Sequence, residues 1–248
     1  MKVPEYAARL QRAAADRTPV DALGVPDLAT GYAVQRLLRE SAGAVVGRRL
    51  GLTGRAERAQ VDADGPVLGF LAGGTALDPG EALDTAQLIR PRCAPGVVFV
   101  LGRDLAGQHT TAAQVLAASS GVAVGLEVLD SRLRDERPAP ADLVADNASA
   151  GRFVVGAPVP PAGIDLRLVG VVLERNGEVV ATASGAAALG HPAAAVAWLV
   201  RALAAEGEGL SAGDVVLSGA LTAAVPVAPG DVVVAAVDRI GTVELGCR

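Results

Sequence analysis

The chain has 248 residues, enough for one large domain with a buried core, or for a small N-terminal element on a main domain. Hydrophobic residues make up 51% of the chain but aromatic residues only 2%, so the core has to be built from Val, Leu and Ala. The net charge of −5, with no basic block and few aromatic side chains for base stacking, excludes a nucleic-acid-binding surface.

The same composition predicts a soluble cytoplasmic protein. No run of 18 apolar residues is free of charge, so no membrane span is expected, and the charged stretch MKVPEYAARLQRAAADR lacks the apolar centre of a signal peptide. Cys93 and Cys247 are too few for a disulfide framework. Lys2 is the only lysine beside abundant arginine, which indicates a composition bias that replaces lysine with arginine.

Helices are expected first along the chain. The spacing of apolar residues predicts helices over residues 4–17 and 28–42, and Asp27 is a suitable N-cap for the second. Residues 61–90 are rich in Gly, Asp and Pro with weak periodicity, which indicates loops and short strands.

Strands predominate in the rest of the chain. Asn176-Gly177 between two β-rich runs predicts a type I′ hairpin. A helix is expected over residues 192–206, with Pro192 in its first turn and His191 just ahead of it. Many short strands with few helices indicate an α+β or mainly β fold. The expected strands before that helix are residues 97–101, 122–128, 153–156, 166–175 and 178–184.

Common catalytic signatures are absent from the sequence. The stretch GRRLGLTG lacks the Gly-Lys-Ser/Thr of a phosphate loop, and no G-x-S-x-G motif occurs. His109 and His191 do not stand at zinc-ligand spacing from the cysteines. No base lies near Cys93 in the sequence, so this thiol is interpreted as buried and structural.

Three polar clusters interrupt apolar segments and are candidates for a site. In GLEVLDSRL, Glu127 lies within an apolar strand, where a carboxylate is costly unless it is paired or functional. The other two are ADNASAG and VVLSGALTAAVPV. Taken singly, these two are explained by loop capping and by a kink in a strand.

Together, these segments resemble the hydratase/decarboxylase branch of the fumarylacetoacetate hydrolase superfamily, which includes 2-oxopent-4-enoate hydratase and 4-oxalocrotonate decarboxylase. The resemblance covers nearly the whole chain in order, and GAAALGHPAAAVAWLVRAL and AGDVVLSGALTAAVPVAPGD are its most specific segments. It implies an α+β fold with a mixed β core, with a helical N-terminal portion at residues 1–45 and a β-rich domain at residues 46–248. It also implies a homodimer or larger homo-oligomer.

The family pattern implies a Mg²⁺ or Mn²⁺ site held by a Glu-x-Glu pair at the head of one strand and a Glu in a second strand. Glu127 matches the third ligand, whereas Ala94 and Gly96 stand at the first two positions. Arg49 replaces a catalytic lysine, and Gly74 replaces an acidic residue. These departures predict that the divalent metal is lost and that the pocket is more apolar and roomier.

The first functional hypothesis is therefore a metal-independent lyase, isomerase or cyclase that acts on an apolar substrate containing an oxo or enol group, in specialised metabolism. Glu127 is the expected acid/base, and Arg49 is expected to bind an anionic group of the substrate. The reaction is left open among hydration, dehydration, isomerisation, cyclisation and decarboxylation. The expected substrate-binding residues are Asn147, Ser149, Ser218 and Thr222.

Two alternatives remain open at this stage. One is a non-catalytic homologue that pairs with an active relative, which the loss of several family residues also fits. The other is an orthodox hydratase or decarboxylase with displaced metal ligands such as Asp78 or Glu81. Retention of Glu127 and of the two polar segments around residues 147 and 218 favours an enzyme.

Overall fold

The computed structural model describes residues 1–248. Its helices and strands in chain order are α1 (Val3–Asp16), α2 (Leu28–Ser41), β1 (Val45–Gly51), α3 (Arg55–Val61), β2 (Val67–Ala72), β3 (Ala76–Leu77), β4 (Arg92–Leu101), α4 (Ala112–Ala118), β5 (Ser119–Leu129), α5 (Pro140–Ala145), β6 (Ala150–Val155), β7 (Gly170–Arg175), β8 (Glu178–Ser184), α6 (Pro192–Ala205), β9 (Val215–Leu217), β10 (Val225–Pro226), β11 (Val232–Val237) and β12 (Gly241–Gly246).

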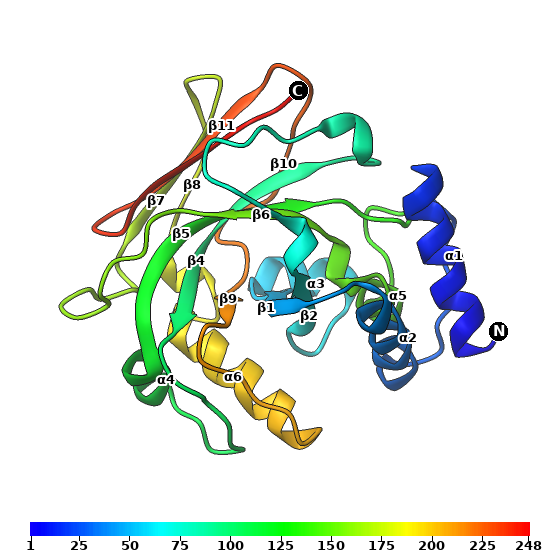
Figure 1. The fold of residues 1–248 in the computed structure, drawn as a ribbon, viewed down its shortest axis with the longest axis horizontal. Coiled ribbons are helices and arrows are strands. Elements are labelled where there is room, and N and C mark those ends of the chain that lie inside the picture. The colour runs from blue at the N-terminus through cyan, green and yellow to red at the C-terminus, as the bar shows by residue number, and fades with distance from the viewer.

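The strands form two sheets. In Figure 1, strands β7, β8 and β11 of one sheet lie at the upper left, and strands β4, β5 and β6 of the other cross the centre. The larger has eight strands in the order β2-β1-β9-β4-β5-β6-β3, with β10 paired to β4, and it is mixed because β1/β9 and β3/β6 are parallel. The smaller is antiparallel in the order β12-β11-β7-β8. This architecture confirms the predicted α+β fold with a mixed β core.

The main core lies between the two sheets and α6. It contains 36 buried residues, of which Phe99 is the only aromatic one, as the composition required. The predicted hairpin is confirmed, since β7 and β8 are joined at Asn176 and Gly177, both with positive φ (56° and 78°). Strand β8 forms an edge of its sheet and leaves Val179 and Val180 exposed.

The antiparallel pair β4/β5 sets the geometry of the site. Ala94 lies opposite Glu127, and Gly96 lies opposite Gly125. Because directly opposed residues and alternate residues share a face of a sheet, Ala94, Gly96 and Glu127 face the same side. The strand that the sequence places at residues 97–101 in fact starts at Arg92.

The N-terminal helices pack mainly on α5, and α2 also contacts β2. A separate cluster of nine buried residues joins α1, α2 and α5. The Asp142 carboxylate accepts hydrogen bonds from the backbone N–H groups of Leu23 (2.8 Å), Gly24 (3.2 Å) and Val25 (2.8 Å). Asp27 caps α2, as expected, by accepting from the Thr30 N–H at 2.7 Å. The division into two domains at residue 45 stays a prediction.

Helix α6 and the turn before it pass one test for a membrane span. The helical stretch Gly185–Ala205 is long and apolar enough to cross a membrane, by length and composition alone. Half of that window is buried inside the protein, however, and α6 contributes Val196, Leu199 and Val200 to the main core. His191 is its N-cap, since its Nδ1 accepts from the Ala193 N–H at 2.9 Å. We therefore interpret α6 as a core helix.

Candidate active site

A buried ion pair between Arg49 on β1 and Glu127 on β5 lies at the centre of the candidate site. The Arg49 Nε donates to Glu127 Oε1, and Arg49 Nη1 donates to the carbonyl of Ala148. The two side chains are only 3% and 4% exposed. Such burial of charge is tolerated because the charges are paired and hydrogen-bonded. The structure therefore brings together the two residues that the sequence analysis expects to be catalytic.

Each partner of this ion pair keeps one free polar atom. Glu127 Oε2 and Arg49 Nη2 have no hydrogen-bond partner in the protein. The only unpartnered side-chain nitrogen or oxygen that is sealed from solvent is Thr53 Oγ1, so Oε2 and Nη2 each keep a small exposed surface. A carboxylate oxygen can accept a proton, and a guanidinium N–H group can bind an anion.

The turn before β6 supports the guanidinium. Its residues Asn147, Ala148 and Ser149 all have positive φ (50°, 50° and 62°), an uncommon backbone conformation for three consecutive non-glycine residues. An ion pair between Arg132 Nε and Asp146 Oδ1 (2.6 Å) holds the start of the turn. Burial raises the pKa of Asp146, and the Arg132 charge opposes that rise. This anchoring fixes the direction of the Ala148 carbonyl.

Of the two predicted binding residues in this turn, the protein engages the side chain of one. The Asn147 amide is used by β2, because it accepts from the Phe70 N–H (2.9 Å) and donates to the Phe70 carbonyl (3.0 Å). The Ser149 side chain is half-buried and makes no hydrogen bond, and its N–H donates to the Asp146 carbonyl at 2.9 Å. Asn147 thus has a structural role in the turn, and the substrate-binding role of both residues stays a prediction.

The two hydroxyl groups predicted after β9 also have protein partners. Ser218 is fully buried, and its Oγ donates to the Val97 carbonyl at 2.8 Å. Thr222 Oγ1 donates to the Ala223 carbonyl at 2.9 Å. The first bond joins the chain after β9 to β4 and the second is local, so both hydroxyl protons are already donated to backbone carbonyls.

Two residues near the ion pair were not selected in the sequence analysis. Thr53 follows β1 and has the sealed, unpartnered hydroxyl. Glu57, in the first turn of α3, accepts from the Gly54 N–H at 3.3 Å. Burial raises the pKa of Glu57, the Gly54 N–H and the Arg49 charge lower it, and the Glu127 charge raises it. The pattern Gly-x-x-Glu directly after the Arg49 strand, which forms the glutamate half of a capping box, could have drawn attention to Glu57.

The residues proposed as displaced metal ligands lie apart from the ion pair. Glu81 Oε2 accepts from the Asp78 N–H at 3.1 Å in an exposed loop. Glu81 and Gly74 line a surface pocket that contains neither Arg49 nor Glu127. No group of three His, Cys, Asp or Glu side chains that could hold a metal ion occurs in the protein.

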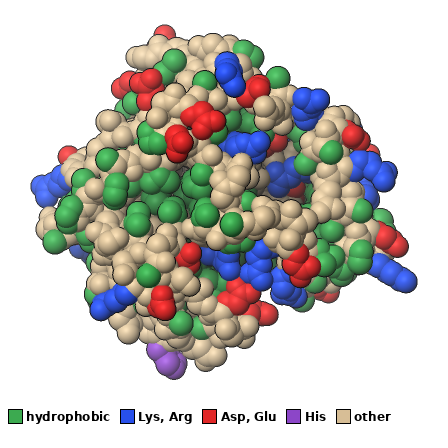
Figure 2. All heavy atoms as spheres, in the orientation of Figure 1, with side chains coloured by type: hydrophobic (Ala, Val, Ile, Leu, Met, Phe, Trp, Pro, Cys, Tyr) green, Lys and Arg blue, Asp and Glu red, His purple; other side chains and the backbone are tan.

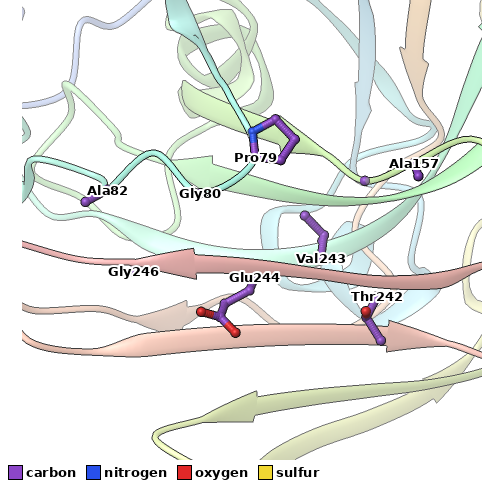
Figure 3. Close-up of a pocket in the computed structure, with 9 residues that line it drawn as sticks. Pro79, Gly80, Ala82, Ala157, Thr242, Val243, Glu244 and Gly246 are labelled. Atoms are coloured by element: carbon purple, nitrogen blue, oxygen red, sulfur yellow. The ribbon is translucent and has the colours of Figure 1, made fainter.

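A second groove, of about 330 Å³, lies between the loop at Pro79 and strand β12. In Figure 3, Val243 points toward this loop, whereas Thr242 and Glu244 point away from it. None of the predicted site residues lines the groove. It therefore offers little of the polar chemistry that a catalytic site needs.

Comparison with known proteins identifies the family. Residues 44–246 match the fumarylacetoacetate (FAA) hydrolase C-terminal family. The chain belongs to this family. It is 44% identical over 213 residues to the 4-oxalocrotonate decarboxylase of Pseudomonas sp. (strain CF600), covering 83% of this chain and 81% of that protein. It is 42% identical over 201 residues to the 2-keto-4-pentenoate hydratase of Paraburkholderia xenovorans (strain LB400), covering 81% of this chain and 75% of that protein.

Solved structures agree with this assignment. The 4-oxalocrotonate decarboxylase from Pseudomonas putida G7, complexed with magnesium and adipate, superposes with a TM-score of 0.94 at 35% identity. The same enzyme complexed with calcium and acetate gives 0.92 at 36% identity. Each match covers 99% of this chain and 97% of the other. The resemblance to the hydratase/decarboxylase branch is thus confirmed, and these relatives support a lyase role.

The same relatives correct the prediction that no divalent metal is involved. Because solved members of this branch hold magnesium or calcium, the expectation of a metal-free protein is wrong on these comparisons. The side chains of this chain nevertheless do not fit the family ligand set. Ala94 and Gly96 offer no ligand atom, and Arg49 holds one oxygen of Glu127. We therefore derive no catalytic step through a metal ion.

Proposed function

We propose that the protein is a lyase of the hydratase or decarboxylase type that acts on a small 2-oxo acid, or its enol form, with an apolar chain. The observation that carries this proposal is the buried ion pair of Glu127 and Arg49, in which Glu127 Oε2 and Arg49 Nη2 have no partner in the protein. The named relatives act in this class of reaction. Figure 2 shows one face of the molecule, on which a hydrophobic area lies on one side and basic side chains lie on the other.

In the proposed reaction, Arg49 binds and Glu127 moves the proton. Arg49 Nη2 donates to the substrate carboxylate, while its Nε keeps Glu127 Oε1 in place. Glu127 Oε2 then transfers a proton to or from the substrate carbon chain. In hydration, a proton adds to one carbon and hydroxide from water to another; in decarboxylation, a proton replaces the departing CO₂. Arginine cannot itself shuttle the proton, because its pKa is too high.

The test is the turnover of 2-keto-4-pentenoate, 4-oxalocrotonate and 2-hydroxyhexa-2,4-dienoate, the compounds in the names of the relatives. The assay is run with and without Mg²⁺. We expect turnover of at least one compound and a loss of about 10²- to 10⁴-fold in the Glu127→Gln variant. Glu178→Gln, on the exposed edge strand β8, is the matched control and should keep full activity. Unchanged turnover in Glu127→Gln would remove Glu127 from the mechanism.

The second candidate function is a non-catalytic partner of an active relative. The observation that favours it is the direct contact of Arg49 with Glu127, because a buried ion pair can be purely structural. This function predicts no turnover of any of the three compounds by the protein alone. It also predicts that the activity of a hydratase or decarboxylase relative changes when the protein is added.

We also propose a homodimer or larger homo-oligomer and a cytoplasmic location. Exposed apolar side chains at Leu168, Val179, Val180 and Val232 are consistent with a surface that another chain covers. Light scattering coupled to size-exclusion chromatography measures the assembly, and a monomer at micromolar concentration would contradict it.

A further inference from the structure

The hydroxyl of Thr53 is the one buried side-chain polar atom without a hydrogen-bond partner. Thr53 is 1% exposed, and its Oγ1 is sealed from solvent. Burying a hydroxyl without a partner costs free energy, because the group loses its bonds to water and gains none in return. Native proteins contain few such groups, so a reason for this one has to be found in its surroundings.

Those surroundings connect Thr53 with the ion pair. Gly219 has a φ of +107°, and a Cβ atom built on it would lie 2.3 Å from Thr53 Oγ1, so only glycine fits there. A Cβ atom on Gly96 would lie 3.0 Å from the Gly219 carbonyl oxygen. Gly96 faces the same side of β4/β5 as Glu127. Gly219 lies next to Gly96, and Thr53 lies next to Gly219.

The segment that carries Thr53 is lightly packed. Helix α3, which directly follows, buries none of its residues. Its main link to the preceding loop is Arg58 Nη1, which donates to the carbonyls of Leu52 and Thr53 at 2.9 Å each. Little apolar burial within α3 therefore opposes a shift of residues 52–61 away from Gly219, and such a shift would expose the hydroxyl of Thr53.

We propose that Thr53 is a substrate-binding residue whose hydroxyl donates a hydrogen bond to a carboxylate or carbonyl oxygen of the 2-oxo acid. This inference rests on the proposed function. Thr53 is favoured over Ser218 and Thr222 because both of those hydroxyls already donate to backbone carbonyls. The ligand oxygen provides the acceptor that the protein itself does not give to Thr53.

The experiment measures the affinity for 2-oxopentanoate, a saturated 2-oxo acid, by isothermal titration calorimetry in a buffer with Mg²⁺. Thr53→Val keeps the shape and removes the hydroxyl, and we expect the Kd to rise about 3- to 10-fold. Thr53→Ser keeps the hydroxyl, so its Kd for 2-oxopentanoate should lie within about two-fold of that of the natural protein. Without ligand, Thr53→Val should melt at the same or a higher temperature, since no protein hydrogen bond is lost.

Thr110→Val is the matched control. Thr110 is also buried, but its Oγ1 donates to the Gly107 carbonyl at 2.9 Å. Its removal should lower the melting temperature and leave the Kd unchanged. Hydrogen exchange adds a second measurement, in which amides of residues 52–61 should exchange more slowly when 2-oxopentanoate is bound.

The outcomes separate this inference from the proposed function. If the natural protein binds 2-oxopentanoate and Thr53→Val binds it equally well, the role of Thr53 is overturned while the proposed function stands. A lower melting temperature of Thr53→Val with an unchanged Kd assigns the hydroxyl a structural role and overturns the inference as well. If the natural protein binds no 2-oxo acid, the proposed function fails and the inference fails with it.

Discussion

Replacing Arg49 with methionine tests the buried ion pair directly. Methionine resembles the apolar methylene part of arginine but lacks the guanidinium. The substitution therefore leaves the Glu127 carboxylate buried without a counter-charge and the Ala148 carbonyl without a donor. Removing one partner of a buried ion pair typically costs about 3–5 kcal/mol. Since each kcal/mol shifts the melting temperature of a chain of this size by about 2–4 °C, the expected fall is about 6–20 °C.

The double variant Arg49→Met/Glu127→Leu provides the decisive comparison. An apolar pair in place of a buried ion pair is often neutral or stabilising, so most of the loss in the single variant should be recovered. Urea denaturation followed by circular dichroism gives the free energy of unfolding for the natural protein, both single variants and the double variant. If the losses of the single variants simply add, or if Arg49→Met costs less than about 1 kcal/mol, the side chains do not form a buried pair.

Three further predictions concern other titrating groups. Burial lowers the pKa of His191, so neutral His191 stabilises the fold at high pH, and the stability relative to His191→Asn should fall as the pH drops through about 6.5. Hydrogen bonds from Arg39 lower the pKa of Glu208, so its contribution relative to Glu208→Gln should be present above about pH 4.3 and be lost below it. Burial raises the pKa of the Cys93 thiol to about 12 and also raises that of Cys247, so neither should react with a disulfide reagent at pH 8 until the protein unfolds.

Thermal unfolding as a function of pH checks the first two, and titration with a chromogenic disulfide checks the third. A pH profile of His191→Asn parallel to that of the natural protein would show that His191 does not titrate as argued. A stability difference for Glu208→Gln that does not change with pH would contradict its pairing with Arg39. Rapid labelling of the folded protein would contradict the burial of Cys93.

Much of the fold was predictable because local patterns and tertiary packing agree. The hairpin at Asn176-Gly177 and the helix after His191 follow from turn and capping chemistry. The start of β4 was missed because proline normally interrupts a strand. The Pro95 carbonyl accepts from the Leu221 N–H, on the side of β4 where neither β9 nor β10 pairs with Pro95. Because the nitrogen and the carbonyl of a strand residue point to the same side, the missing N–H of Pro95 removes no hydrogen bond between strands.

The candidate site was only partly predictable. A carboxylate within an apolar strand directed attention to Glu127, and the structure places Arg49 against it. Whether a hydroxyl is free depends on acceptors far away in the sequence, such as the Val97 carbonyl that binds Ser218 across 121 positions. For the same reason, no local pattern could show that Thr53 lacks a partner.

The position of α6 in the chain affects which apolar surface is exposed while the protein is being synthesised. Its apolar residues surround the helix instead of forming one stripe, and α6 contributes several of them to the main core that it shares with both sheets. The strands β9, β11 and β12 that complete those sheets follow α6 in the chain. During synthesis, α6 therefore leaves the ribosome before the core around it is complete. A nascent chain that stops after Ala205 presents a helix with membrane-like hydropathy, which is a target for chaperones and a starting point for aggregation.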